Sequence, residues 1–228
     1  MKINPILSVQ GLAARRGRRI VVDRADLHIF PGDRINVQGE NGCGKSTLLE
    51  ALLGLIPSTA SQREWLGLSG TPNHHSAFRD GSAVYLPQFR NLFPSLSLRA
   101  NIFIGSSLET REKRSRLLQV CTVFPEIVPL LDASPRAVSG GLRQITAVLR
   151  TLMHCPRLLV LDEPMAGISD AAIPALCNLL LQFGSEGSAI LYTDHHQSVA
   201  NELANRCFTM VGGILSSRPE VLHPKERQ

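Results

Sequence analysis

The sequence predicts an α/β fold built on a parallel sheet, and three observations support this. A glycine-rich segment at residues 39–46, GENGCGKS, fits the phosphate-binding pattern G-x-x-x-x-G-K-[ST]. Apolar, strand-like runs alternate with helix-like runs along the chain. A run of four apolar residues at 158–161 ends in two acids, Asp162 and Glu163. In such sheets the ligand lies at the carboxyl ends of the strands, so we expect a nucleotide there.

The composition is typical of a globular chain. Of its 228 residues, 43% are hydrophobic and 19% charged, enough for one large domain or two small lobes around a core. We expect no membrane span and no signal peptide, because no run of 18 apolar residues exists and the first residues lack a long apolar core. The five cysteines lack metal-binding spacing, which indicates a reducing, cytoplasmic setting.

The residue pattern in the first third of the chain predicts strands followed by one helix. Residues 5–38 alternate between apolar and polar types in short runs, as β-strands do. The basic cluster at residues 15–19 is read as a solvated hairpin turn rather than a nucleic-acid patch. Residues 34–38 form a short buried strand before the glycine loop, and residues 44–54 a helix that ends at Gly54.

The remainder predicts further alternation of strands and helices. Leu142, Ile145, Leu149 and Leu152 fall on one helical face within a mostly helical region at 95–153. The other expected elements are a loop or weak strand at 57–81, strands at 82–86, 157–161 and 188–193, helices at 171–183 (closed by Gly184) and 196–205, and two short strands within 208–217.

Residues 39–47 have the residue types that phosphate binding requires. The glycines allow a tight backbone curve, so several N–H groups can face one anion, and the helix beginning near Gly44 adds its positive dipole end. Lys45 can reach the β- and γ-phosphates, and the Ser46 hydroxyl can bind Mg²⁺. Cys43 is either a redox-sensitive thiol or, as we favour, a small filling residue. The nucleotide-binding residues predicted here are Gly39, Glu40, Asn41, Gly42, Cys43, Gly44, Lys45, Ser46 and Thr47.

Acids, an amide and an imidazole follow the later strands. The Asp162 carboxylate can bind magnesium through water, and Glu163 is placed to polarise the attacking water as general base. The amide of Gln88 can bind magnesium and sense the γ-phosphate. His195 can contact the γ-phosphate and the water that Glu163 activates. We therefore predict Glu163 and His195 as catalytic, and Ser46, Gln88 and Asp162 as metal-binding.

A second anion-binding helix start lies at Ser139, Gly140 and Gly141. The first backbone N–H groups of a helix bind anions, although a Ser-Gly-Gly sequence by itself is often only a helix cap. One nucleotide already has its loop at residues 39–46. The second site therefore suggests contact with the phosphate of another molecule.

These segments together resemble the ATP-binding-cassette (ABC) family over nearly the whole chain. They occur in the family order, which is more specific than any one of them. Residues 39–47 match the Walker A motif, Gln88 the Q-loop, residues 138–142 the L-S-G-G-Q signature, residues 158–163 the Walker B motif and His195 the switch histidine.

The resemblance implies a single ABC nucleotide-binding domain at residues 1–228 with the P-loop NTPase fold. It would have a RecA-like core, an N-terminal antiparallel β subdomain and a helical subdomain at about 89–150. It implies binding of ATP with Mg²⁺, and ATP hydrolysis. It also implies a head-to-tail dimer with a second ABC ATPase subunit, identical or different. Each ATP would lie between one subunit's Gly39 loop and the other subunit's Ser139-Gly140-Gly141, and hydrolysis would release the dimer.

The chain departs from the family pattern at several positions. The signature carries Val138 and Leu142 where Leu and Gln or Glu are usual, and Met165 replaces the usual Thr or Ser. The D-loop position carries Ser169, with Asp170 one residue late. No aromatic residue precedes Walker A to stack on adenine, and Arg16 or Arg18 could take that place. We therefore expect hydrolysis, with a weaker contact at the signature.

The resemblance further implies a membrane transporter. The chain would be its peripheral ATPase on the cytoplasmic face, bound to integral transmembrane subunits through a groove near Gln88. Residues 91–101 and the pair Phe124-Pro125 resemble the helical lobe of branched-chain amino-acid importer ATPases. Some apolar side chains either line the groove or belong to the core of this lobe: Leu92, Phe93, Leu96 and Leu98.

Two other functions fit the motifs less well. A soluble ABC ATPase acting on nucleic acid or ribosomes usually has a long coiled coil or two cassettes, and this chain has neither, so nucleic acid is disfavoured as a partner. A nucleotide-binding regulator with little turnover would tolerate the altered signature. The intact Glu163 and His195 argue against it.

Overall fold

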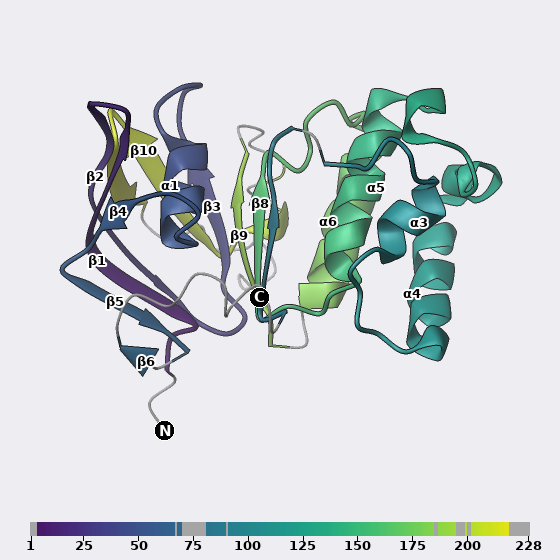
Figure 1. The fold of residues 1–228 in the computed structure, drawn as a ribbon, viewed down its shortest axis with the longest axis horizontal. Coiled ribbons are helices and arrows are strands. Elements are labelled where there is room, and N and C mark those ends of the chain that lie inside the picture. The colour runs from purple at the N-terminus through teal and green to yellow at the C-terminus, as the bar shows by residue number, and fades with distance from the viewer. Residues whose placement is uncertain are drawn as a thin grey trace, which may run out of the picture.

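The computed structural model describes residues 4–66, 68–69, 81–89, 91–184, 187–194, 199 and 202–218. Figure 1 shows a small antiparallel sheet on one side, a larger sheet in the middle and a group of helices on the other side. The predicted α/β architecture is therefore present.

The small sheet is built around a long hairpin. Strands β1 (Leu7–Arg16) and β2 (Arg19–Ile29) pair antiparallel and are joined by two residues, Gly17 and Arg18. Gly17 has a φ of 59°, as the tight hairpin turns that match strand twist require. The predicted turn in the basic cluster is confirmed. The strand order is β2-β1-β5-β6 with β4 also on β1; these short strands are β4 (Ser58–Thr59), β5 (Gln62–Trp65) and β6 (Leu68–Ser69).

The larger sheet has the order β11-β10-β3-β9-β8-β7. All neighbours are parallel except the β10–β11 hairpin. Strands β8 and β9 are buried along their whole length, which explains their continuous apolar sequences. Because the strands are parallel, their carboxyl ends share one edge. The strands are β3 (Arg34–Gln38), β7 (Ala83–Leu86), β8 (Leu158–Asp162), β9 (Ala189–Thr193), β10 (Arg206–Val211) and β11 (Ile214–Ser217).

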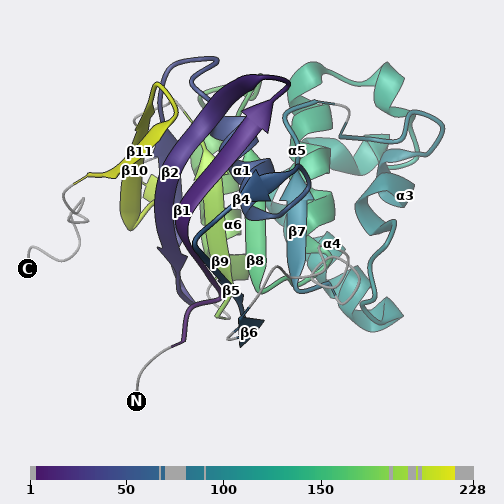
Figure 2. The same cartoon turned by 60° about the vertical axis from the view of Figure 1, so that its left-hand side comes forward.

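Helices cover the two faces of the larger sheet with separate hydrophobic clusters. Helix α1 (Lys45–Leu52) lies between the two sheets, in a cluster that includes side chains of β1, β2, β3 and β8. Figure 2 shows the β1–β2 hairpin in front of the larger sheet on this side. Helices α5 (Gly140–Leu152) and α6 (Ile173–Gly184) belong to the other cluster.

The segment between β7 and β8 is mostly helical, as expected. It contains α3 (Leu98–Phe103), α4 (Thr110–Val123), the 3-10 helices η1 (Pro125–Leu130) and η2 (Pro135–Ala137), and α5. Helix α6 begins two residues later than expected and includes Gly184. The expected helix at 196–205 lies largely outside the described residues, as do residues 70–80 of the expected weak strand.

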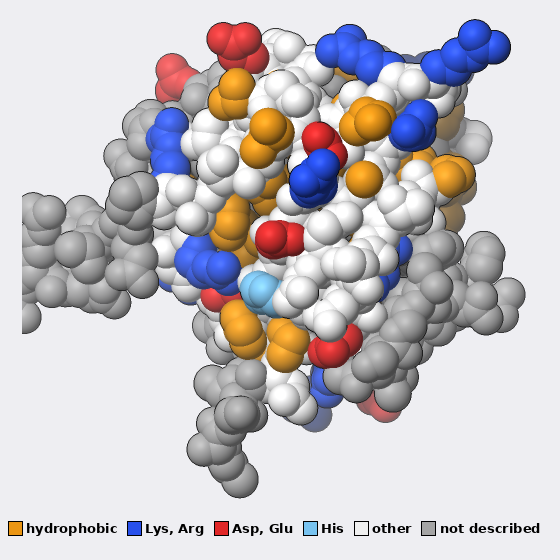
Figure 3. All heavy atoms as spheres, turned by 90° about the vertical axis from the view of Figure 1, so that its left-hand side faces the viewer, with side chains coloured by type: hydrophobic (Ala, Val, Ile, Leu, Met, Phe, Trp, Pro, Cys, Tyr) orange, Lys and Arg blue, Asp and Glu red, His pale blue; other side chains and the backbone are white. Residues whose placement is uncertain are grey.

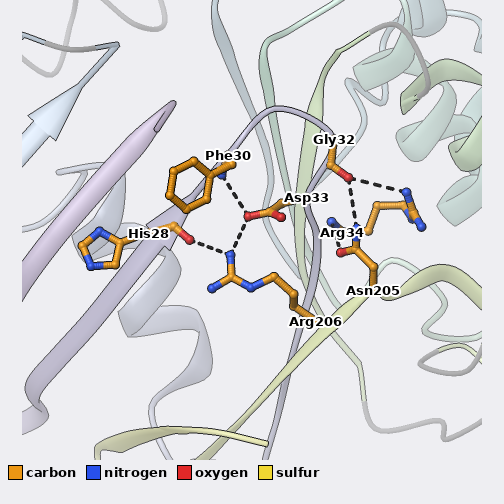
Figure 4. A network of polar contacts seen from close by, with 7 residues as sticks. All are labelled: His28, Phe30, Gly32, Asp33, Arg34, Asn205 and Arg206. Atoms are coloured by element: carbon orange, nitrogen blue, oxygen red, sulfur yellow. Dashed lines mark hydrogen bonds and ion pairs between the residues drawn. The ribbon is translucent and has the colours of Figure 1, made fainter. Parts of the chain in front are cut away.

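A polar network ties the small sheet to the larger one at the edge where β3 begins (Figure 4). Arg206 at the start of β10 donates from Nη1 to Asp33 Oδ2 at 2.5 Å and to the carbonyl of His28 at 2.8 Å. Asn205 bridges the same turn, because its Oδ1 accepts the Arg34 N–H at 2.7 Å and its Nδ2 donates to the Gly32 carbonyl at 3.2 Å. The turn between β2 and β3 is thereby held on β10.

Candidate nucleotide-binding site

The glycine loop begins at the carboxyl end of β3 and leads directly into α1. Gly39 has a φ of 157°, and a Cβ there would lie 2.4 Å from the Met210 carbonyl oxygen. Gly44 has a φ of 113°, and its Cβ would lie 2.9 Å from the carbonyl oxygen of Val21. Because these contacts are with backbone atoms, the two positions require glycine. No side chain caps α1, so the backbone N–H groups of its first turn are oriented for an anion.

Lys45 is held across the loop. Its ammonium group donates to the carbonyl oxygens of Gly39 at 2.7 Å and Glu40 at 3.0 Å. The side chain is buried, so the ammonium group keeps one position inside the bend of the loop and does not sample several rotamers in solvent. Cys43 packs against the hydrophobic cluster between the sheets, which supports a filling role.

Asp162 ends β8 at the same edge of the sheet. Its side chain is only 2% exposed, and its Oδ1 accepts a hydrogen bond from the Thr193 hydroxyl at 2.6 Å. The same hydroxyl accepts the backbone N–H of Glu163 at 2.9 Å. Burial, together with the charge of Asp162, raises the pKa of Tyr85 on the neighbouring strand β7, so this phenol stays protonated.

Glu163 is held by three groups in an unusual backbone conformation. Its φ is 50°, a left-handed conformation that costs a residue with a side chain roughly 1–2 kcal/mol. Its carboxylate accepts a hydrogen bond from Gln88 Nε2 at 2.7 Å, which brings the predicted Gln88 and Glu163 together. Its carbonyl oxygen accepts from Gln144 Nε2 at 3.2 Å. Gln144 was not predicted, because a lone glutamine inside a helix matches no motif.

A pocket of about 470 Å³ joins the loop to these groups. Arg16 lies on its wall, where its Nε donates to the Thr47 hydroxyl at 3.4 Å and its guanidinium pairs with Glu50. Arg16, not Arg18, therefore occupies the neighbourhood expected for an adenine-stacking group. The lining residues are Arg16, Val21, Asn41, Gly42, Gly44, Lys45, Ser46, Thr47, Gln88 and Glu163.

Ser139, Gly140 and Gly141 lie apart from this pocket, at the start of α5. Ser139 caps the helix, because its hydroxyl oxygen accepts the Leu142 N–H at 3.2 Å. Ser139 and Gly140 are exposed. Gly141 is packed so closely that an added Cβ would lie 2.8 Å from the carbonyl oxygen of Gly167. Within one chain the structure therefore does not bring these three residues together with the phosphate loop.

The residues that depart from the family pattern fall into a buried group and an exposed group. Val138, Leu142 and Met165 are all buried in the hydrophobic cluster of α5 and α6. Apolar residues at these positions are explained by that packing. Ser169 and Asp170 are exposed. His195 lies outside the described residues.

The sequence profile of the ABC transporter family matches residues 22–166. The chain belongs to the ABC transporter family. This confirms the predicted family and its ATP-binding, ATP-hydrolysing cassette. The cassette is 29% identical over 93% of its length to the ribose import ATP-binding protein RbsA 2 of Escherichia coli O157:H7. It is 33% identical over 97% of its length to the Nod factor export ATP-binding protein I of Cupriavidus metallidurans.

The cassette spans 43% of the ribose import protein and 74% of the Nod factor export protein. It also superimposes on a dimeric ATP-binding cassette in a post-hydrolysis state bound to ADP and Pi. The TM-score is 0.80 at 19% identity, covering 94% of this chain and 98% of that one. This confirms the predicted fold class. The resemblance to branched-chain amino-acid importers is not confirmed by these relatives.

Proposed function

We propose that two cassettes, identical or different, close head-to-tail around two ATP molecules and thereby move the transmembrane subunits of a transporter. One observation carries this proposal. The chain presents two separate helix starts of a kind that can bind an anion, one in the pocket beside Glu163 and one exposed at Ser139 and Gly140. A second cassette would bring its exposed start to the first pocket and complete the site.

The residues of the pocket suit the parts of Mg²⁺-ATP. The loop N–H groups and Lys45 would bind the phosphates, and the flat guanidinium of Arg16 offers a stacking surface to the base. Ser46, Gln88 and Asp162 offer oxygen ligands, which fits magnesium, a hard cation. When bound, the ion would neutralise phosphate charge. Glu163 would take the proton of the attacking water. His195 is proposed beside it on the sequence pattern alone.

A groove beside Gln88 is the proposed contact with the integral subunits. It has a volume of about 560 Å³, and Phe89 on its wall is 73% exposed. Leu92 lines the groove and also packs against the hydrophobic core, whereas Leu98 is fully buried in that core. We propose that a cytoplasmic segment of an integral subunit occupies this groove and holds the cassette peripherally on the cytoplasmic face. Residues 1–228 would act as one domain, with the helical subdomain at about 89–150.

Two observations concern how the cassette could contact a membrane or a nucleic acid. Among the described residues no helix is long and apolar enough to cross a bilayer. Figure 3 shows the face over the small sheet, where some basic side chains gather at the upper edge and the others are interspersed with acidic and hydrophobic ones. A nucleic-acid site usually presents a continuous basic stripe, which does not run across this face. This face therefore gives little support to the nucleic-acid alternative.

The Glu163→Gln variant tests the proposed site. It removes the base but keeps an amide of the same shape, so ATP should bind and remain uncleaved. We expect a stable dimer with Mg²⁺-ATP by size-exclusion chromatography, and none with Mg²⁺-ADP. A variant that stays monomeric with saturating ATP would contradict the proposal. Affinity capture of the wild-type cassette from detergent extracts should recover an integral membrane protein.

A further inference from the structure

The Glu163–Pro164 turn is held by hydrogen bonds at the Glu163 N–H, at its carboxylate and at both carbonyl oxygens. The Glu163 N–H bonds to Thr193, and the carboxylate accepts from Gln88. Gln144 Nε2 lies 3.2 Å from the carbonyl oxygens of both Glu163 and Pro164. A left-handed glutamate persists only where its surroundings impose it. The Glu163 carbonyl also accepts the Ala166 N–H at 3.1 Å within the turn, and Gln144 is the side-chain donor that reaches both carbonyls from α5.

Gln144 also connects two other parts of the molecule. It lies on α5 about one turn after Gly140, so it moves with the exposed helix start. Its Oε1 accepts from Asn91 Nδ2 at 3.4 Å, and both residues line the groove beside Gln88. The Asn91 contact, at 3.4 Å, exceeds the usual N–H···O range, whereas the two carbonyl contacts, at 3.2 Å, lie at its upper limit. The carbonyl contacts are therefore the part of this arrangement that fixes geometry.

We propose that Gln144 is a positioning residue, whose amide donates to the Glu163 and Pro164 carbonyls and so aims the Glu163 carboxylate at the nucleotide pocket. This rests on the proposed role of Glu163 as general base. Gln144 would thus link two sites. Glu163 would act on the ATP bound to the same chain, and the start of α5 would contact the ATP bound to the second cassette. A displacement of α5 then changes the direction of the base.

Two variants separate the donor role from simple packing. Gln144→Met has similar size and no hydrogen bonds. Gln144→Glu keeps the acceptor for Asn91 but places carboxylate oxygens against two carbonyls. We expect both to lower kcat about tenfold to a hundredfold, the range for small misplacements of a catalytic group. The Kd for Mg²⁺-ATP should stay within about twofold of wild type, because the phosphate-binding groups are untouched.

Gln119→Met is the matched control, because Gln119 is exposed and its amide bonds only another exposed side chain, Gln182, among the contacts described for it. Its kcat and its Kd for Mg²⁺-ATP should match those of the wild-type cassette. A wild-type kcat in either Gln144 variant overturns the proposal. So does a parallel loss of ATP affinity and kcat, which would indicate a merely structural role.

A crystal structure of Gln144→Met gives a readout that does not depend on turnover. We expect Glu163 to leave the left-handed region or its carboxylate to move away from Gln88. An unchanged Glu163 conformation overturns the proposal. A wild-type cassette that neither binds ATP nor dimerises would instead contradict the proposed function, and the crystal structure would still decide the role of Gln144.

Discussion

Lys45 and Glu163 show how single residues of this cassette are held in place by neighbouring groups. The Lys45 ammonium bridges two carbonyl oxygens of its own loop, and Glu163 holds a left-handed backbone conformation through bonds to Thr193, Gln88 and Gln144. Motif spacing predicted both residues and their chemistry. It could not predict the conformation of Glu163, because a φ value depends on partners from β9 and α5.

The Lys45→Ala variant should bind ATP much more weakly. Lys45 supplies a buried positive charge to the pocket, and a hydrogen bond from a charged group contributes roughly 1.5–3 kcal/mol, about tenfold to a hundredfold or more in affinity. The variant also leaves two loop carbonyls without their donor. Isothermal titration with Mg²⁺-ATP measures this. Lys113→Ala, on α4, is the control; undiminished affinity in Lys45→Ala would refute the assignment.

Among the helices, α5 combines an exposed start with a side that contacts the Glu163 turn through Gln144. Its exposed start carries Ser139 and Gly140, whereas Gly141 faces the turn at Gly167. Helical periodicity predicted α5 and its apolar face. The close approach at Gly141 was not predictable, because it depends on the path of the chain after β8.

Gly141→Ala should destabilise the cassette, whereas Gly140→Ala should not. The added methyl group at 141 would lie 2.8 Å from the Gly167 carbonyl oxygen, and overpacking of this kind costs about 1–3 kcal/mol. At 140 the nearest atom is a flexible Arg143 nitrogen at 3.8 Å, so helix propensity should make the change neutral or stabilising by up to about 1 kcal/mol. Urea unfolding of both variants measures the difference. Equal stabilities would contradict the packing argument.

The end of α5 should make stability sensitive to acid. Burial, and then the charge of Arg150, lower the pKa of His154 below 6.5, although a hydrogen bond with the backbone of Ile104 acts in the opposite direction. The unfolded chain therefore binds a proton more readily. This contribution to stability is constant above about pH 6.5 and is lost as the pH falls from there to the folded pKa. In His154→Gln, unfolding free energies at pH 7.5 and 5.5 should differ less than in wild type.

At the scale of the whole molecule, two sheets enclose α1 and share one hydrophobic cluster. The network around Asp33 fixes the turn that leads from the small sheet into β3, and β3 leads into the phosphate loop. The position of the loop relative to Asp162 thus depends on contacts between segments about 170 residues apart.

Arg206→Ala should destabilise the whole cassette. The ion pair is partly buried, with Arg206 33% and Asp33 13% exposed, and the variant leaves Asp33 and the His28 carbonyl without this donor. We expect a loss of about 1–3 kcal/mol in unfolding free energy. The control Arg99→Ala removes an exposed pair with Asp132, which solvent screens, and should leave the unfolding free energy close to that of wild type. Equal losses would show that the network contributes nothing specific.

Local sequence patterns were enough to predict the ligand class and the succession of strands and helices along the chain, but not the order of the strands in the larger sheet. These follow from local patterns: the glycines and Lys45 of the loop, the acids after a buried strand and the period of α5. Three features became visible only in the folded chain: Gln144 contacts the Glu163 turn, Arg16 lies on the pocket wall, and Gly141 has no room for a side chain. Each of these depends on side chains and backbone from distant segments that meet only when the sheets and helices pack.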